Sequence, residues 1–109
     1  MVIVRPSIVG AAYSDPHVGW VDNLAALSGF IFVYGIGLLH QAPGKFSNRA
    51  NFIPVDYVVN TIIACAVYQA GNNTLLVCHA ANQYINPVTH REVIQSIHDF
   101  SERNPFDRK

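Results

Sequence analysis

The chain has 109 residues, of which half are hydrophobic and 13% are charged, and its formal net charge is zero. This length supports one domain at most, and the neutral balance gives no electrostatic basis for binding nucleic acid or an anionic membrane. Typical soluble domains are about 25% charged, and no charged residue falls between Asp56 and Arg91. We therefore expect a partner surface to cover the middle of the chain.

The first half of the chain predicts one strand, one long loop and one helix. Val2–Val4 is a short apolar run typical of a strand buried on both faces of a parallel sheet, and it ends at Arg5-Pro6 because proline removes a ladder donor. Residues 11–22 form a loop that is longer than an ordinary connection. Asn23 can cap a helix that begins at about Leu24, although the apolar run 30–34 also has strand propensity.

The second half predicts a helix, a strand and a final helix. The helix Val55–Gln69 follows Pro54 and has apolar residues at three- and four-residue steps. A strand is expected over Leu75–Cys78, and a last helix over about His90–Arg103. This alternation predicts an α/β fold that contains half of a βαβ architecture. Two parallel strands cannot form a closed core, so the pattern is typical of the back end of a larger domain.

Few side chains suggest chemistry by their spacing alone. Cys65 and Cys78 lack the spacing of a zinc site or a disulfide framework, so they are expected to be reduced core thiols. Arg5 is expected to be a buried or half-buried cation paired with a carboxylate elsewhere, for which the absent half of the domain is one source, and Asp56 to organise a helix start. The histidines form no metal-ligand pattern: His17, His40, His79, His90 and His98.

Several sequence blocks resemble those of one enzyme family. They occur in the order "VRPSIVGA" (4–11), "GWVDN" (19–23), "IPVDYVVN" (53–60) and "NPVT" (86–89). Together they resemble the fatty acyl-CoA reductases, also called male-sterility-like proteins, which belong to the extended short-chain dehydrogenase/reductases. The resemblance covers nearly the whole chain.

The resemblance implies a Rossmann-like reductase domain that uses NADPH to reduce long-chain acyl-CoA to a fatty alcohol. The 109 residues would form its C-terminal portion, with the substrate-binding segment. Residues 1–10 would be a strand and the nicotinamide-side turn, residues 11–54 the substrate-pocket loop and helix, and residues 55–103 a helix–strand–helix unit. The glycine-rich turn and the Tyr-x-x-x-Lys pair of such enzymes are not found in this sequence, so no catalytic residue is predicted in it and the chain alone is expected to be inactive.

The resemblance also implies binding residues. Pro6, Ser7, Ile8 and Val9 would lie beside the nicotinamide ring, because a proline at the strand end would free the following backbone groups from sheet pairing; a plain strand exit is the alternative. The substrate-binding candidates are Trp20, Asn23, Phe30 and Tyr34. An acyl channel lined by aromatic residues competes here with ordinary core packing.

Three functions remain open at this stage. The first is part of a fatty acyl-CoA reductase, which would require the remainder of the reductase domain. The second is another extended reductase with a sugar-nucleotide, steroid or thioester substrate. The third is a truncated, non-catalytic partner of another reductase chain. The resemblance is compatible with a cytoplasmic, peroxisomal or membrane-associated location. Residues 106–109 do not match a peroxisomal address, and the apolar run 27–39 is too short to cross a bilayer.

Overall fold

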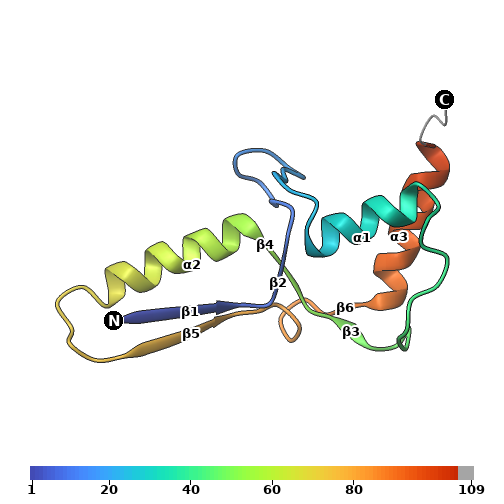
Figure 1. Cartoon of the computed structure of the whole chain (residues 1–109). Helices are drawn as coiled ribbons and strands as arrows, with labels where there is room; N and C mark the ends of the chain where they lie inside the picture. The colour runs from blue at the N-terminus through green and yellow to red at the C-terminus, as the bar shows by residue number, and fades with distance from the viewer. Residues whose placement is uncertain (106–109) are drawn as a thin grey trace.

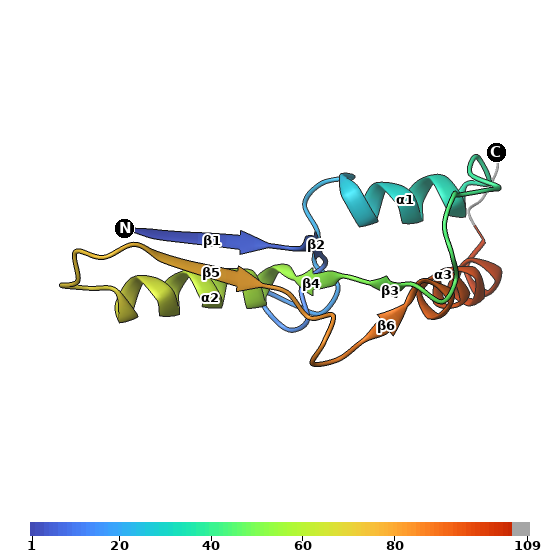
Figure 2. The ribbon, with the colours of Figure 1, turned by 90° about the horizontal axis from the view of Figure 1, so that it is seen from below.

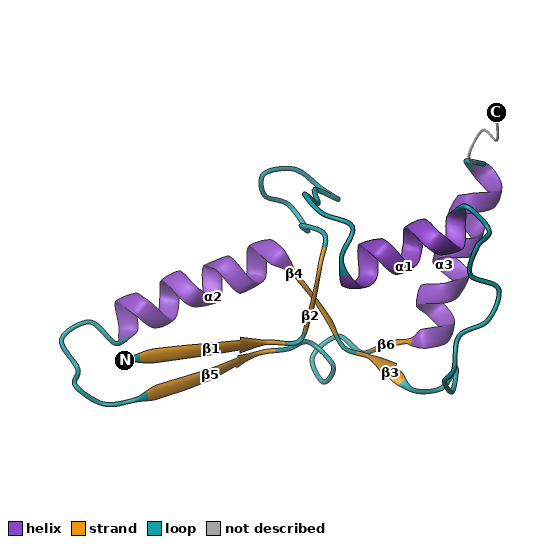
Figure 3. Cartoon of the chain, viewed as in Figure 1, coloured by secondary structure: helices purple, strands orange, loops and turns teal. Residues whose placement is uncertain are grey.

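Three helices and six short strands make up the computed structural model, which describes residues 1–105 (Figures 1 and 3). The expectation about residues 106–109 lies outside this range. The α/β class is confirmed. The strands are β1 (Val2–Pro6), β2 (Ile8–Gly10), β3 (Arg49–Ala50), β4 (Phe52–Pro54), β5 (Leu76–Ala80) and β6 (Val88–Thr89), and the helices are α1 (Ala26–Gly35), α2 (Val55–Tyr68) and α3 (His90–Arg103).

One half of the molecule is a parallel strand pair covered by a helix. β1 pairs with β5 in the register Val2↔Leu76, and α2 lies along one face of the pair (Figure 1). Val4 packs against a small buried cluster of Ile53, Val58 and Ala80. The strand–helix–strand order predicted for this half is confirmed. Alternate residues of each strand meet the apolar side of α2.

The other half holds two further strand pairs and two helices. β2 pairs with β4 in parallel, β3 pairs with β6 antiparallel, and α1 and α3 are in contact with each other. Figure 2 shows the two halves lying end to end, with β2 and β4 between them. The sequence did not predict β2, β3, β4 or β6, because runs of two or three residues carry almost no periodicity.

The starts of α3 and α1 differ in whether a local capping residue acts there. α3 spans the predicted residues His90–Arg103, and the side chains of Thr89 and Glu92 form a capping box at its start. By contrast, Asn23 does not cap α1, which begins at Ala26. The Asn23 side chain instead accepts a hydrogen bond from the Ala25 backbone N–H at 3.0 Å, a turn-type contact that competes with capping.

The described residues alone do not cover β1. The strand was expected to be buried on both faces, yet Ile3 is 41% exposed and its partner Val77 is 45% exposed. Arg5 was expected to be at least half-buried and ion-paired, but it is exposed and has no carboxylate partner within residues 1–105. Both differences have one cause, since α2 covers one face of the strand pair and the described residues place nothing on the other.

The molecule exposes more surface than a compact domain of its mass. Its accessible area is 8306 Å², whereas a folded monomer of 12.0 kDa has about 6,000 Å². Its radius of gyration is 16.8 Å, against about 13 Å for a compact chain of this length. Much of the excess is apolar, including a second stripe along α2 formed by Val59, Ile62, Ile63 and Val67.

This exposed apolar surface predicts the behaviour of the purified chain. We expect the 109-residue chain to be marginally stable and to form oligomers or aggregates, because open strand faces and a second apolar helix stripe favour association. Co-expression with the matching upstream part of a related reductase should increase its solubility. Sedimentation and light scattering test this, and a monodisperse monomer with a cooperative melt above about 55 °C would contradict it.

Candidate functional site

An apolar pocket of about 410 Å³ lies between α1, α3 and the β2–β4 pair. This volume is within the usual range for small-molecule sites, about 300–1,000 Å³, and such sites are mostly apolar. It is lined by Ile8, Ala26, Leu27, Phe30, Ala42, Pro43, Gly44, Lys45, Phe46, Phe52, His90, Val93 and Ile94. We call it the apolar pocket.

The walls of the apolar pocket come from distant parts of the chain. Ile8 and Phe52 are paired across β2 and β4 and form one side. The loop 42–46, which precedes β3, forms another. This loop is attached to the start of α3, because Arg91 donates its backbone N–H to the Phe46 carbonyl at 3.1 Å and His90 donates to the Asn48 carbonyl at 2.9 Å.

A second hollow of about 230 Å³ lies beside the long loop. Trp20, Asp22 and Asn23 line it together with Val9, Gly10, Val21, Ala25, Ala26, Ser28 and Val55. β2 lies between the two hollows, since Ile8 lines the apolar pocket and the next residue, Val9, lines the second hollow. This follows from strand geometry, in which successive side chains point to opposite faces.

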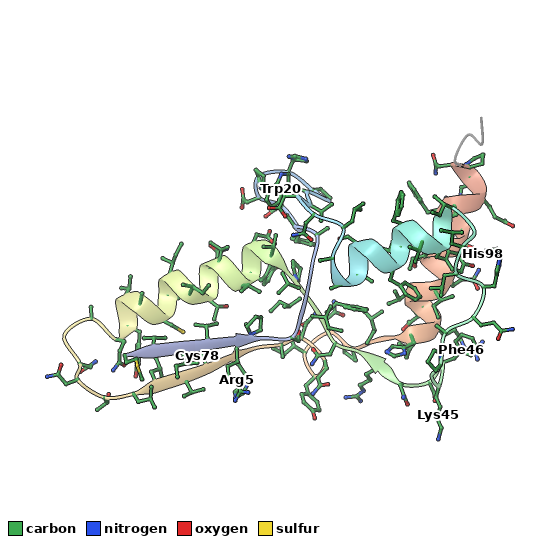
Figure 4. All side chains as sticks on the ribbon, viewed as in Figure 1. Arg5, Trp20, Lys45, Phe46, Cys78 and His98 are labelled. Carbon is green, nitrogen blue, oxygen red and sulfur yellow. The ribbon has the colours of Figure 1, made fainter. Side chains whose placement is uncertain are left out.

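The substrate-binding candidates are divided between these places. Phe30 lines the apolar pocket, while Trp20 and Asn23 line the second hollow. The Tyr34 hydroxyl lies 3.3 Å from Nδ1 of His98 and so links α1 to α3. Figure 4 shows Trp20 in the long loop, well apart from Phe46 and His98. Within residues 1–105, Trp20, Phe30 and Tyr34 do not line one common hollow, because β2 separates the long loop from α3.

The backbone of the predicted nicotinamide-side stretch is occupied, not free. The Ser7 N–H donates to the Ala80 carbonyl at 2.9 Å, and the Ile8 N–H donates to the Asn51 carbonyl at 3.2 Å. The expectation that Pro6 would release these groups is wrong. The reason is that the chain passes directly from its pairing with β5 into its pairing with β4, so the Ser7 and Ile8 amides both find acceptors.

Two buried polar atoms near this stretch have no hydrogen-bond partner. They are Oγ of Ser7 and Oδ1 of Asn51. Leaving such an atom unsatisfied costs about 1–3 kcal/mol, and a buried group of this kind in a folded protein calls for an explanation such as a ligand or an ordered water. Side-chain groups of Ser7 and Asn51, in place of backbone amides, are thus the polar atoms available to a bound molecule here.

Asp56 attaches the long loop to the first turn of α2. Its carboxylate accepts hydrogen bonds from the backbone N–H groups of Tyr13 at 3.0 Å, Ser14 at 2.9 Å and Asp15 at 3.3 Å, and from the Ser14 hydroxyl at 3.2 Å. Burial raises the pKa of Asp56, but these donors together hold it well below its usual range. Asp56 lies in the first turn of α2, as predicted, but its carboxylate bonds to the long loop and caps no backbone group of the helix.

The two cysteines meet between α2 and β5. Their Sγ atoms are 2.9 Å apart, and both are free, half-buried thiols. The Cys65 thiol donates its hydrogen bond to Sγ of Cys78, which raises the pKa of Cys65, and burial raises it further. Within residues 1–105, no group of three or more His, Cys, Asp or Glu side chains has an arrangement that could hold a metal ion.

The comparison with known protein families agrees with the sequence blocks. Residues 1–62 match the model of an NAD-binding family described as male sterility protein. The chain belongs to this family. The predicted Rossmann-like fold class is therefore confirmed, and the family implies a nicotinamide cofactor. Because the match covers β1, β2, α1 and the first part of α2, it includes the whole predicted nicotinamide-side stretch.

Individual relatives of the chain are reductases. It is 37% identical over 110 residues to fatty acyl-CoA reductase 1 of Xenopus laevis and 36% identical over 110 residues to that of Mus musculus. It is 38% identical over 111 residues to fatty acyl-CoA reductase 2 of Homo sapiens. Each alignment includes 99% of this chain but 21% of the relative. The chain thus spans about a fifth of the length of these relatives.

Sequence reasoning missed the wall of the apolar pocket that comes from the loop 42–46. Lys45, Phe46 and His90 were not among the predicted site residues, although all three line the pocket. The sequence held one signal of an apolar wall in this segment. The 33 residues from Asn23 to Val55 contain no Asp or Glu and include a Pro-Gly turn at 43–44. Pairing this segment with the start of α3 required the antiparallel contact of β3 with β6.

The contacts of Asp56 predict a loop that loosens in acid. Because the pKa of Asp56 is lower in the folded state than in the unfolded chain, its stabilising effect is complete above about pH 4, the ordinary range of Asp, and is lost as the pH falls further. Asp56→Asn should abolish this pH dependence and reduce amide-exchange protection at Tyr13, Ser14 and Asp15 already at pH 6.

The matched control is Asp22→Asn, which changes an exposed aspartate in the same loop. It should leave the protection of residues 13–15 unchanged. Exchange rates corrected for intrinsic pH dependence provide the measurement, and equal protection in Asp56→Asn and the parent chain would show that the carboxylate does not hold the loop.

Proposed function

We propose that this chain is part of an NADPH-dependent fatty acyl-CoA reductase and that the apolar pocket binds the acyl chain of its substrate. One observation carries the proposal: Ile8, which the family resemblance assigns to the nicotinamide-side stretch, also lines the apolar pocket. A reductase must bring the reacting carbonyl of its substrate to the hydride of its cofactor. At β2, an acyl chain and a nicotinamide ring would be adjacent.

The chemistry of the pocket favours an acyl chain over the other substrates considered. Most lining residues are aliphatic or aromatic, and the lining has no Asp or Glu. A sugar nucleotide would need several hydrogen-bonding partners in the pocket, since buried polar groups without partners are costly. An acyl chain needs none and gains from burial of its methylenes, at about 0.8 kcal/mol each.

The residues present fit one edge of a nicotinamide cofactor. The carboxamide of the ring both donates and accepts hydrogen bonds, and the unpartnered Ser7 hydroxyl and Asn51 side-chain oxygen offer one group of each kind. The bound cofactor supplies the hydride. In this proposal, Ser7 and Asn51 orient the ring, Ile8 borders both the ring and the acyl chain without separating their reacting atoms, and Pro6 and Val9 flank the ring at the end of β1 and in β2.

The remaining parts of the proposal rest on the family resemblance. They are the choice of NADPH over NADH, the alcohol as product, and a location that is cytoplasmic or associated with a peroxisomal or other organelle membrane. The resemblance also implies that the glycine-rich turn and the proton donor come from other segments of the reductase domain. No helix within residues 1–105 is long and apolar enough to cross a membrane.

The proposal predicts that the chain alone has no reductase activity. The purified 109 residues mixed with NADPH and palmitoyl-CoA should give no change in absorbance at the NADPH band and no alcohol product, because no Tyr-x-x-x-Lys proton donor is present in the sequence. Measurable turnover by this chain would contradict the proposal.

The acyl pocket itself can be tested in a chimera. Residues 1–109 would replace the matching segment of the Mus musculus reductase, and the activity of this chimera would be compared across acyl-CoA lengths. Phe30→Ala in the apolar pocket should change the ratio of kcat/KM between long and short acyl chains about tenfold, with a smaller effect on the KM for NADPH.

Trp20→Ala is the comparison variant, because Trp20 lies in the second hollow. It should leave the acyl-length profile nearly unchanged. If Trp20→Ala changes the profile and Phe30→Ala does not, the acyl chain lies on the long-loop side of β2, and the proposed pocket is wrong.

A further inference from the structure

The apolar pocket has two ends that differ in their surroundings. At β2, Ile8 follows Ser7 and belongs to the nicotinamide-side stretch. At the other end, the loop 42–46 runs from α1 toward β3 and lies beside the first turn of α3, and Figures 1 and 2 both show this loop apart from β2. If the carbonyl of the substrate reacts near β2, the tail of its acyl chain points toward this loop.

We propose that Phe46 forms the end wall of the apolar pocket and limits the length of acyl chain that the reductase accepts, and that Arg91 positions it. This inference rests on the proposed function, because it assumes that the acyl chain lies in the apolar pocket. Phe46 is the bulkiest residue of the loop 42–46, and it lines the pocket. Figure 4 shows Phe46 next to Lys45, below α3.

Arg91 holds Phe46 in two ways. Its guanidinium carbon lies 5.4 Å from the centroid of the Phe46 ring, within the range of a cation–π interaction. Its backbone N–H donates to the Phe46 carbonyl at 3.1 Å. The first turn of α3 that carries Arg91 is itself fixed by the capping box of Thr89 and Glu92. Backbone and ring of Phe46 are thus tied to the same turn of the same helix.

A second arginine–aromatic pair close by serves as a matched control. Arg49 lies 5.8 Å from the ring centroid of Tyr84, and its Nη1 donates to the Gln83 carbonyl at 3.4 Å. Tyr84 is 80% exposed and is not part of the pocket lining. Both pairs place an arginine guanidinium over an aromatic ring. Only the Phe46–Arg91 pair borders the apolar pocket, through Phe46.

The test measures kcat/KM of the chimera for palmitoyl-CoA and for arachidoyl-CoA, which has a longer acyl chain. Phe46→Ala should raise the ratio of arachidoyl-CoA to palmitoyl-CoA activity about tenfold, since a few methylenes change discrimination by this order. Phe46→Trp should lower the ratio. Arg91→Gln should raise it less than Phe46→Ala, and Arg91→Lys should keep the parent ratio because it retains the cation. Tyr84→Ala and Arg49→Gln should leave it unchanged.

The outcomes separate this inference from the proposed function. If Phe30→Ala changes the length profile but Phe46→Ala and Phe46→Trp do not, the end wall is elsewhere and this inference is wrong. If none of the three changes the profile, the acyl chain does not lie in the apolar pocket, and the proposed function of the pocket is wrong. Should Phe46→Ala fail to fold, Phe46→Trp and Phe46→Leu decide the question. Equal shifts in Tyr84→Ala would also overturn the inference.

Discussion

The architecture depends on one buried carboxylate at the junction of its two halves. Asp56 is 6% exposed and stands where β4 ends and α2 begins. Its oxygens accept hydrogen bonds from three backbone N–H groups of the long loop. These hydrogen bonds hold the loop over the edge of β2. Without these bonds the loop that carries Trp20 would have few contacts to hold it, and the second hollow would lose a wall.

The position of β2 between the two hollows follows from the course of the chain after Pro6. The backbone leaves its pairing with β5 and enters its pairing with β4 without an intervening loop, so β2 lies between two hollows of different character. Alternation along this short strand directs Ile8 to the apolar pocket and Val9 to the second hollow. In the proposed function, this strand would border both the nicotinamide ring and the acyl chain.

The β1–β5 pair and α2 leave apolar surface exposed. α2 covers one face of the β1–β5 pair, while Ile3, Val77 and its own second stripe face outward. A sheet of parallel strands is stable in α/β proteins when both faces are covered. The relatives are about five times longer than this chain.

The sequence by itself determined the family, the α/β class and the elements with strong local signals. α3 follows from its capping box and its amphipathic period, and α2 follows from Pro54 and its apolar steps, because these signals act over a few residues. Tertiary structure alone decided the rest. The short strands β2, β3, β4 and β6 exist only through their partners, and the pairing of β3 with β6 brings Phe46 to Arg91 across 45 residues of sequence. Contacts of this kind depend on the path of the backbone in space, which residue periodicity does not encode.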